Sequence, residues 1–177
     1  MFKSFRQSCL LLAIFLLLIA CSPKLNWRIV QAPEQRYAAL FPGKPDKLER
    51  KISIGDQQFV QTLEAVKLDD DIYSISSIEI PAKDNKGDLV QKITAQLQNN
   101  LLDRAKASGG SVVDEAAYFQ NSQRQRLQTN DYYIFFGGDV KAKQIMRVRW
   151  ITRANADGGV WIYQVSCLLY TSDAADD

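Results

Sequence analysis

The clearest structural signal in the chain is the stretch Gln144-Ile-Met-Arg-Val-Arg-Trp-Ile-Thr-Arg153. Within it, Met146, Val148 and Trp150 alternate with two arginines, so the apolar and charged side chains fall on opposite sides of an extended strand. This alternation is typical of an antiparallel sheet with one buried and one solvated face. We therefore expect Gln144 to Arg153 to be a strand of such a sheet.

Further strand signals lie on both sides of this stretch. Turn sequences occur at Pro42-Gly43-Lys44-Pro45, Gly55-Asp56 and Asn155 to Gly159. Between such turns the chain is rich in β-branched and aromatic residues, and strands are predicted at 36–41, 48–54, 57–68, 72–80, 111–120, 132–137 and 160–166.

One segment has the helical period instead. Between Asp88 and Ser108 an apolar stripe recurs at spacings of three and four, formed by Val90, Ile93, Leu97, Leu101 and Ala105. Asp88 is expected to accept amide hydrogen bonds at the start, and Gly109-Gly110 to provide a left-handed stop. The order of elements predicts an α+β domain in which an antiparallel β-sheet packs with one long helix.

The N-terminus has the layout of a secretory signal. Lys3 and Arg6 precede an apolar run from Leu10 to Ala20. This run would extend only roughly 16 Å as a helix, whereas the hydrocarbon core of a bilayer is about 30 Å thick. A cleaved signal is therefore favoured over a transmembrane anchor.

The residues after this run resemble a known processing site. Leu18-Ile19-Ala20-Cys21 is similar to the lipobox of bacterial lipoproteins. The resemblance implies that residues 1–20 are removed, that Cys21 carries the lipid, and that residues 21–35 form the lipid anchor and linker. Ser22 resembles the default that directs such lipoproteins to the outer membrane. The alternative is an ordinary cleaved signal followed by a chance cysteine.

The C-terminal residues, Cys167 to Asp177, resemble the in-frame translation of a sequencing-library adapter. We expect residues 167–177 to be a non-native tail, 36–166 to form a single domain, and the natural sequence to continue past Ser166. The alternative is a genuine acidic tail. Because residues 160–166 are apolar on both strand faces, one helix cannot cover them, and an amphipathic helix is expected in the missing continuation.

Composition excludes several kinds of site from the expected domain. The formal net charge of the chain is +2, which is too small to indicate nucleic-acid binding. Histidine is absent, and the three cysteines are Cys9 in the signal, Cys21, and Cys167 in the tail. Disulfides, thiolate or imidazole metal sites and His-dependent catalysis are therefore not expected, and no metal or cofactor is predicted.

A second resemblance concerns the whole domain. Tyr37-Ala-Ala-Leu-Phe-Pro-Gly-Lys-Pro45, the strand containing Ile72-Tyr73-Ser74, the helix ending at Gly109-Gly110 and the final Trp161-Ile-Tyr163 look like the PsbP-like superfamily. This resemblance implies an α/β/α sandwich whose C-terminal helix would lie in the missing part. It also implies a small binding or assembly module, usually without catalysis.

One hairpin concentrates positive charge. Its cations are Lys141, Lys143, Arg147, Arg149 and Arg153. Arg147 and Arg149 share a strand face, which can bind an anionic lipid, lipopolysaccharide or glycan, or can simply be solvated.

Other motifs have ordinary structural interpretations beside a functional one. Asp69-Asp70-Asp71 is a solvated turn or a calcium ligand set. Ser74, Ser76 and Ser77 lie in a strand pattern, although one of them paired with a lysine would be a nucleophile. Gly137-Gly138-Asp139 is a turn that lacks the other residues of a phosphate loop. The residues Tyr132, Tyr133, Trp150 and Trp161 are expected to pack in the core.

These observations favour a non-enzymatic lipoprotein of the outer membrane. Its periplasmic domain would bind another envelope component, protein or glycan, in an accessory or assembly role, and it would contact the membrane through the N-terminal lipid. The alternatives are a periplasmic hydrolase that uses Ser and Lys or paired carboxylates, and a carrier of a small ligand.

We predict that Cys21→Ser leaves an uncut precursor without lipid, because acylation needs the thiol and cleavage follows acylation. Growth with labelled palmitate, followed by gel analysis, should show label in the wild type only. Equal labelling of the mutant would contradict the lipobox interpretation.

Overall fold

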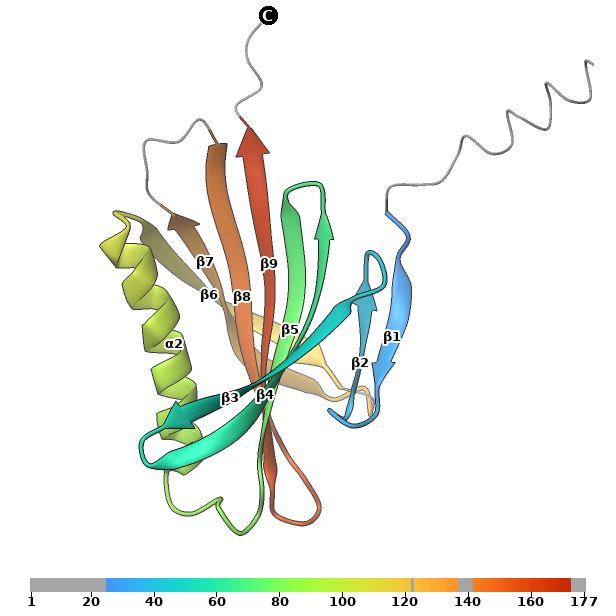
Figure 1. Cartoon of the computed structure of the whole chain (residues 1–177), viewed down its shortest axis with the longest axis vertical. Helices are drawn as coiled ribbons and strands as arrows, with labels where there is room; N and C mark the ends of the chain where they lie inside the picture. Colours follow the sequence, from blue (N-terminus) through green and yellow to red (C-terminus); the bar gives the residue numbers. More distant parts are fainter. Residues whose placement is uncertain (1–24, 122, 137–141, 173–177) are drawn as a thin grey trace, which may run out of the picture.

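The computed structural model describes residues 25–121, 123–136 and 142–172 (Figure 1). The lipobox with Cys21, the cation Lys141, the predicted turn at Gly137-Gly138-Asp139 and tail residues 173–177 lie outside the described residues.

The described chain forms two antiparallel sheets and one helix. β1 (Arg28–Ala32) and β2 (Tyr37–Phe41) make a two-stranded hairpin. The main sheet has the order β3-β4-β5-β9-β8-β7-β6. Its strands are β3 (Asp46–Ile54), β4 (Gln57–Leu68), β5 (Asp71–Ile80), β6 (Ser111–Gln120), β7 (Arg126–Phe136), β8 (Ala142–Ala154) and β9 (Val160–Ser172), and the helix is α2 (Leu89–Ala107). An antiparallel sheet packed with one long helix is therefore confirmed.

The last strand, β9, lies near the middle of the main sheet. It pairs with β5 on one side and with β8 on the other. In this register Ile162 lies opposite Ile78, while Tyr163 lies opposite Ser77 and Ile151. Successive β9 side chains point to opposite faces, so both faces of the sheet need a cover at this position.

Helix α2 covers one face of the main sheet (Figure 1). Ile93 in its first half packs with buried Ile80 and Ile162, and Ala105 near its end packs with buried Ile134 and Val148. The apolar stripe predicted for this segment is therefore the contact face of the helix.

The β1–β2 hairpin covers part of the opposite face, on the side of the sheet away from α2 (Figure 1). Phe41 of β2 is buried in a cluster with Ile75, Trp161 and Tyr163. β1 lies within the segment expected to be anchor and linker, so an ordered strand occurs where only a connection was predicted.

The helix termini match the sequence in one respect and differ in another. The predicted stop is confirmed, because Gly109 has φ +74° and the amide of Gly110 donates to the Ala105 carbonyl at 2.9 Å. The predicted Asp88 cap is wrong. The Asp88 side chain makes no capping hydrogen bond and pairs instead with Lys92 Nζ at 2.9 Å, because a lysine one turn along offers it a charged partner.

Most predicted strand bounds agree with the structure to within two residues, but two of them are wrong by more. β7 begins at Arg126 instead of Tyr132, because its first residues pair with β6. β9 continues past Ser166 to Ser172, because Cys167 and the residues after it stay paired with β5 and β8.

We expect Ile93→Ala to lower the free energy of unfolding by about 2–5 kcal/mol, because it removes fully buried methyl groups between α2 and the sheet. Leu48→Ala is the matched control, since Leu48 is largely exposed on β3, and it should change stability by less than about 0.5 kcal/mol. Urea unfolding of both variants measures the difference. Equal losses would show that α2 does not cover the core.

Candidate functional site

An open groove of about 1000 Å³ lies on the surface of the domain. It lies between the β1–β2 hairpin and the turn end of the β6–β7 hairpin, on the sheet face opposite α2. Its apolar lining includes Ala38, Ala39, Ile75, Phe119, Leu127, Ile151, Tyr163 and Val165.

Strand parity explains why this groove is apolar. Tyr163 and Val165 are alternate residues of β9 and therefore point to the same face. The β1–β2 hairpin buries Tyr163, whereas Val165 and Leu127 remain more than one-third exposed. The hairpin thus ends before the apolar surface does, and the uncovered remainder lines the groove.

Hydrogen bonds hold the turn of the β1–β2 hairpin against the main sheet. The Tyr37 hydroxyl donates to the carboxylate of buried Glu64, and the Tyr163 hydroxyl donates to the Gln35 carbonyl at 2.8 Å. Arg153 Nη1 donates to the Arg36 carbonyl at 2.9 Å. Burial, followed by the bond to Glu64, raises the pKa of Tyr37, so this phenol stays protonated at neutral pH.

Positive charge gathers at one end of the groove. Arg36 and Arg153 both line it, and its described lining residues include no Asp or Glu. Burial raises the pKa of Tyr163, while the charges of Arg153 and Arg36 oppose that rise, so both guanidinium groups act on the same phenol. Glu79, two strands from Arg153 across Trp161, acts on the same phenol in the opposite sense and raises its pKa. This end of the groove therefore favours an anionic group.

The structure divides the basic residues singled out in the sequence. Arg153 is at the groove, and Arg147 and Arg149 lie beside it on the same face of β8. The backbone of Lys143 is in β8, but its side chain, like all of Lys141, lies outside the described part of the structure.

Arg147 and Arg149 share one carboxylate, that of Asp131 on β7. Arg149 Nε is 2.6 Å from Asp131 Oδ1, and Arg147 Nη2 is 2.5 Å from Oδ2. Asp131 is only 3% exposed. The hydrogen bond from Arg149 lowers the pKa of Asp131, with Arg147 adding to this and burial opposing it. The trio carries one net positive charge, so this part of the face is less basic than the sequence suggested.

Asp69 and Asp70 form the two-residue turn between β4 and β5, and Asp71 Oδ1 accepts from the Tyr170 amide at 3.0 Å. Across the described ranges no three His, Cys, Asp or Glu side chains gather closely enough to hold a metal ion.

The strand serines bond to neutral partners. The hydroxyls of Ser74 and Ser166 are 2.8 Å apart, and Gln61 Nε2 donates to Ser76 Oγ at 2.6 Å.

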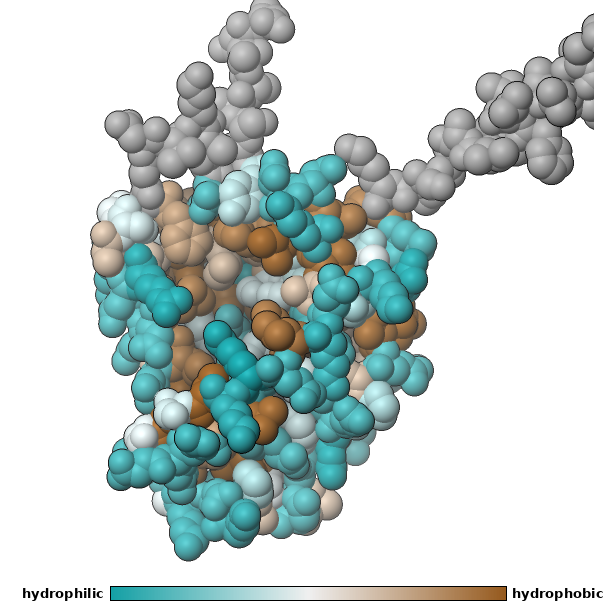
Figure 2. Space-filling view, in the orientation of Figure 1, coloured by the Kyte–Doolittle hydropathy of each residue, from teal (hydrophilic) through white to brown (hydrophobic). Residues whose placement is uncertain are grey.

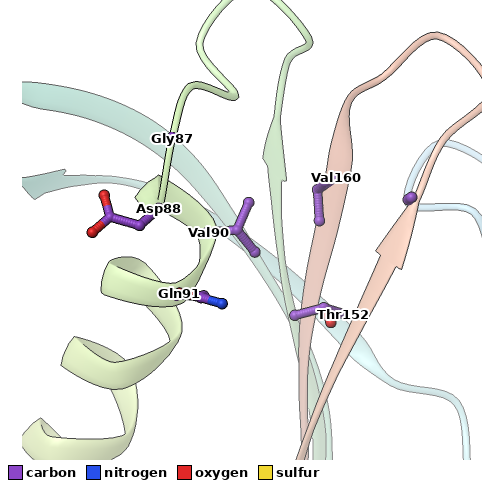
Figure 3. Close-up of a pocket in the computed structure, with 7 residues that line it drawn as sticks. Gly87, Asp88, Val90, Gln91, Thr152 and Val160 are labelled. Carbon is purple, nitrogen blue, oxygen red and sulfur yellow. The ribbon is translucent and has the colours of Figure 1, made fainter.

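A smaller hollow of about 420 Å³ lies where α2 begins (Figure 3). Val90, Thr152 and Val160 point into it. Figure 3 shows the Asp88 carboxylate pointing away from Thr152 and Val160. The hollow therefore brings no reactive side chains together.

Sequence reasoning missed Arg36, Tyr37 and Glu64 as members of one site. Tyr37 and Glu64 are 27 residues apart, and each belongs to an unremarkable strand pattern. The only signal was Glu64 itself, which stands between the apolar residues Leu63 and Ala65 of a predicted strand. A buried carboxylate needs a polar partner, but the sequence does not identify that partner.

Comparison with protein-family models finds none that matches this chain. Comparisons with curated proteins and with solved structures find no match either.

We predict that Asp131→Asn lowers the free energy of unfolding by about 1–3 kcal/mol at pH 7, because two arginines lose a charged acceptor. The pKa of Asp131 is lower in the folded state, so its contribution is present above the unfolded pKa of about 4 and is lost as the pH falls through the folded pKa.

The stability difference between wild type and Asp131→Asn should therefore shrink below about pH 4. Urea unfolding at several pH values measures it, and Asp56→Asn in an exposed turn is the control. A difference that persists at pH 2 would mean that the effect is not one of charge.

Proposed function

We propose that this chain is a lipoprotein anchored to the outer membrane through Cys21 and that its domain binds an extended segment of another envelope protein. The observation that carries the proposal is the open groove on the sheet face opposite α2, with its apolar floor and basic end. Exposed apolar surface of this kind marks binding sites in soluble domains. The role is that of a non-enzymatic accessory or assembly module.

The wall of the groove favours an extended partner. Tyr37, Ala38 and Ala39 are consecutive residues of β2 and all line the groove. Among the described strands β2 pairs with β1 alone, so its other edge keeps unpaired backbone groups. An extended peptide can pair with such an edge while its alternate side chains enter an apolar floor.

The basic end specifies the charge of the partner. Arg36 and Arg153 face a groove that no acidic residue of the described ranges lines, so an acidic side chain or a C-terminal carboxylate fits there. This assignment keeps Arg153 in the anionic-partner face predicted from the sequence and moves the centre of that face from Arg147 and Arg149 to Arg36.

The finer assignment of the fold to the PsbP-like superfamily is part of the same proposal. The long helix on one face of an antiparallel sheet and the β2 motif Tyr37 to Phe41 support it. In the described residues no helix is long and apolar enough to cross a membrane.

A small-ligand carrier is the second candidate. The groove volume of about 1000 Å³ is at the upper end of the range for ligand sites, and its floor is apolar. A carrier, however, needs a closed cavity to exclude water, and this groove is open along one side.

A photo-crosslinking amino acid at Leu127 tests the proposal in intact cells. We expect it to capture an envelope protein, because Leu127 lines the groove and is partly exposed. The same probe at Leu48, exposed on the edge strand β3, should not capture that protein.

Val165→Arg should abolish capture from Leu127 by filling the floor of the groove. Capture that is the same from Leu48, or that survives Val165→Arg, would contradict binding in the groove. A lipid adduct in place of a protein would favour the carrier.

A further inference from the structure

A second apolar surface lies where the described chain begins, on the β1–β2 hairpin. Ile29 and Leu40 are directly opposed across the two strands and are 72% and 60% exposed. Leu25 and Trp27, just before β1, are 49% and 48% exposed. Figure 2 shows apolar surface over this hairpin, below the point where the chain enters. We call these four residues the entry patch.

The entry patch is not part of the groove. None of its four residues lines the groove. The patch is at the end of the hairpin where β1 starts and β2 finishes, whereas the groove reaches the turn at the other end. The proposed binding function therefore leaves this surface unexplained. Four large apolar side chains that are each about half exposed or more are unusual on a surface in contact with water.

Chain length ties the entry patch to the membrane. Leu25 is only four residues after Cys21, and four residues span at most roughly 14 Å even when fully extended. If Cys21 carries acyl chains in the bilayer, Leu25 cannot lie farther than this from the membrane surface. The interfacial region on each side of the hydrocarbon core is itself several ångströms thick, about 5–8 Å.

The chemistry of the entry patch suits that location. Tryptophan is enriched at membrane interfaces because its ring is apolar and its N–H is polar. The Trp27 ring packs edge-on against Tyr73, with 6.0 Å between ring centroids, so one side is held by the domain while the rest stays exposed. Arg28 is exposed beside it and can contact anionic headgroups.

We propose that the entry patch rests in the lipid headgroup region, so that the β1–β2 hairpin fixes how the domain sits on the membrane. The inference depends on the lipidation in the proposed function but not on the groove. With the patch in the membrane, the opposite end of the hairpin points away from it and the groove stays open to the periplasm.

The test uses the processed, full-length chain purified from membranes and reconstituted into vesicles of phosphatidylethanolamine and phosphatidylglycerol with brominated acyl chains. We expect bromine to quench tryptophan emission in the wild type and not in Trp27→Phe, because Trp150 and Trp161 are buried in the domain. The double variant Ile29→Ser, Leu40→Ser should reduce the quenching to about half or less, since it removes most of the inserted apolar surface.

Leu48→Ser is the matched control, because Leu48 is as exposed as Leu40 but lies on β3. It should leave the quenching unchanged.

Labelled palmitate measured in the same preparation separates the lipidation of Cys21 from the membrane contact of the entry patch. Absence of palmitate would overturn both the lipoprotein assignment and the entry patch, whereas palmitate without quenching of Trp27 would overturn the entry patch alone. A Trp27 emission that changes with protein concentration in vesicles without bromine would assign the patch to a second copy of the chain and also overturn the proposal.

Discussion

Burial of β9 on both of its faces is the constraint on which the rest of this structure depends. Ile162 points to one face of the main sheet and is almost fully buried, while its neighbours Trp161 and Tyr163 point to the other and are buried too. If the side chains on either face of β9 were left in water, the folded state would lose several kcal/mol of stability, because burial of each large apolar side chain contributes roughly 1.5–3 kcal/mol. Two separate elements therefore have to cover it.

The two covers are unequal, and the difference creates the candidate site. Helix α2 has 19 residues and packs along its face from Ile93 to Ala105. The β1–β2 hairpin has five residues in each strand and covers only the part of the other face around Phe41. Beyond the hairpin, the apolar surface continues as the groove floor. It then gives way to the network of Asp131, Arg147 and Arg149, in which one carboxylate offsets one of the two positive charges.

The sequence was sufficient for the elements with a regular period. The alternation in Gln144 to Arg153 and the apolar stripe of α2 predicted a strand and a helix that the structure confirms. The β1–β2 hairpin was missed as a cover because five-residue strands are too short to show a period, and its docking depends on Glu64, which is distant in sequence. Such pairings are set by tertiary packing and leave no local pattern.

The candidate site was only partly predictable for a related reason. The alternation of side chains along a strand correctly placed Arg147 and Arg149 on one face of β8. Their shared partner, Asp131, was not foreseen because the predicted strand began one residue later, at Tyr132, whereas β7 begins at Arg126. Strand ends are the least regular part of a sequence pattern, and here that error concealed the carboxylate that both arginines share.

A double-mutant cycle between Tyr37 and Glu64 tests most directly whether the hairpin is the second cover of β9. Tyr37→Phe, Glu64→Gln and the combined variant are unfolded in urea. If the hairpin is seated as described, the two changes should be coupled by about 0.5–3 kcal/mol, because they remove the same buried hydrogen bond. Effects that add to within about 0.3–0.5 kcal/mol would contradict the account, since residues that do not touch behave in that way.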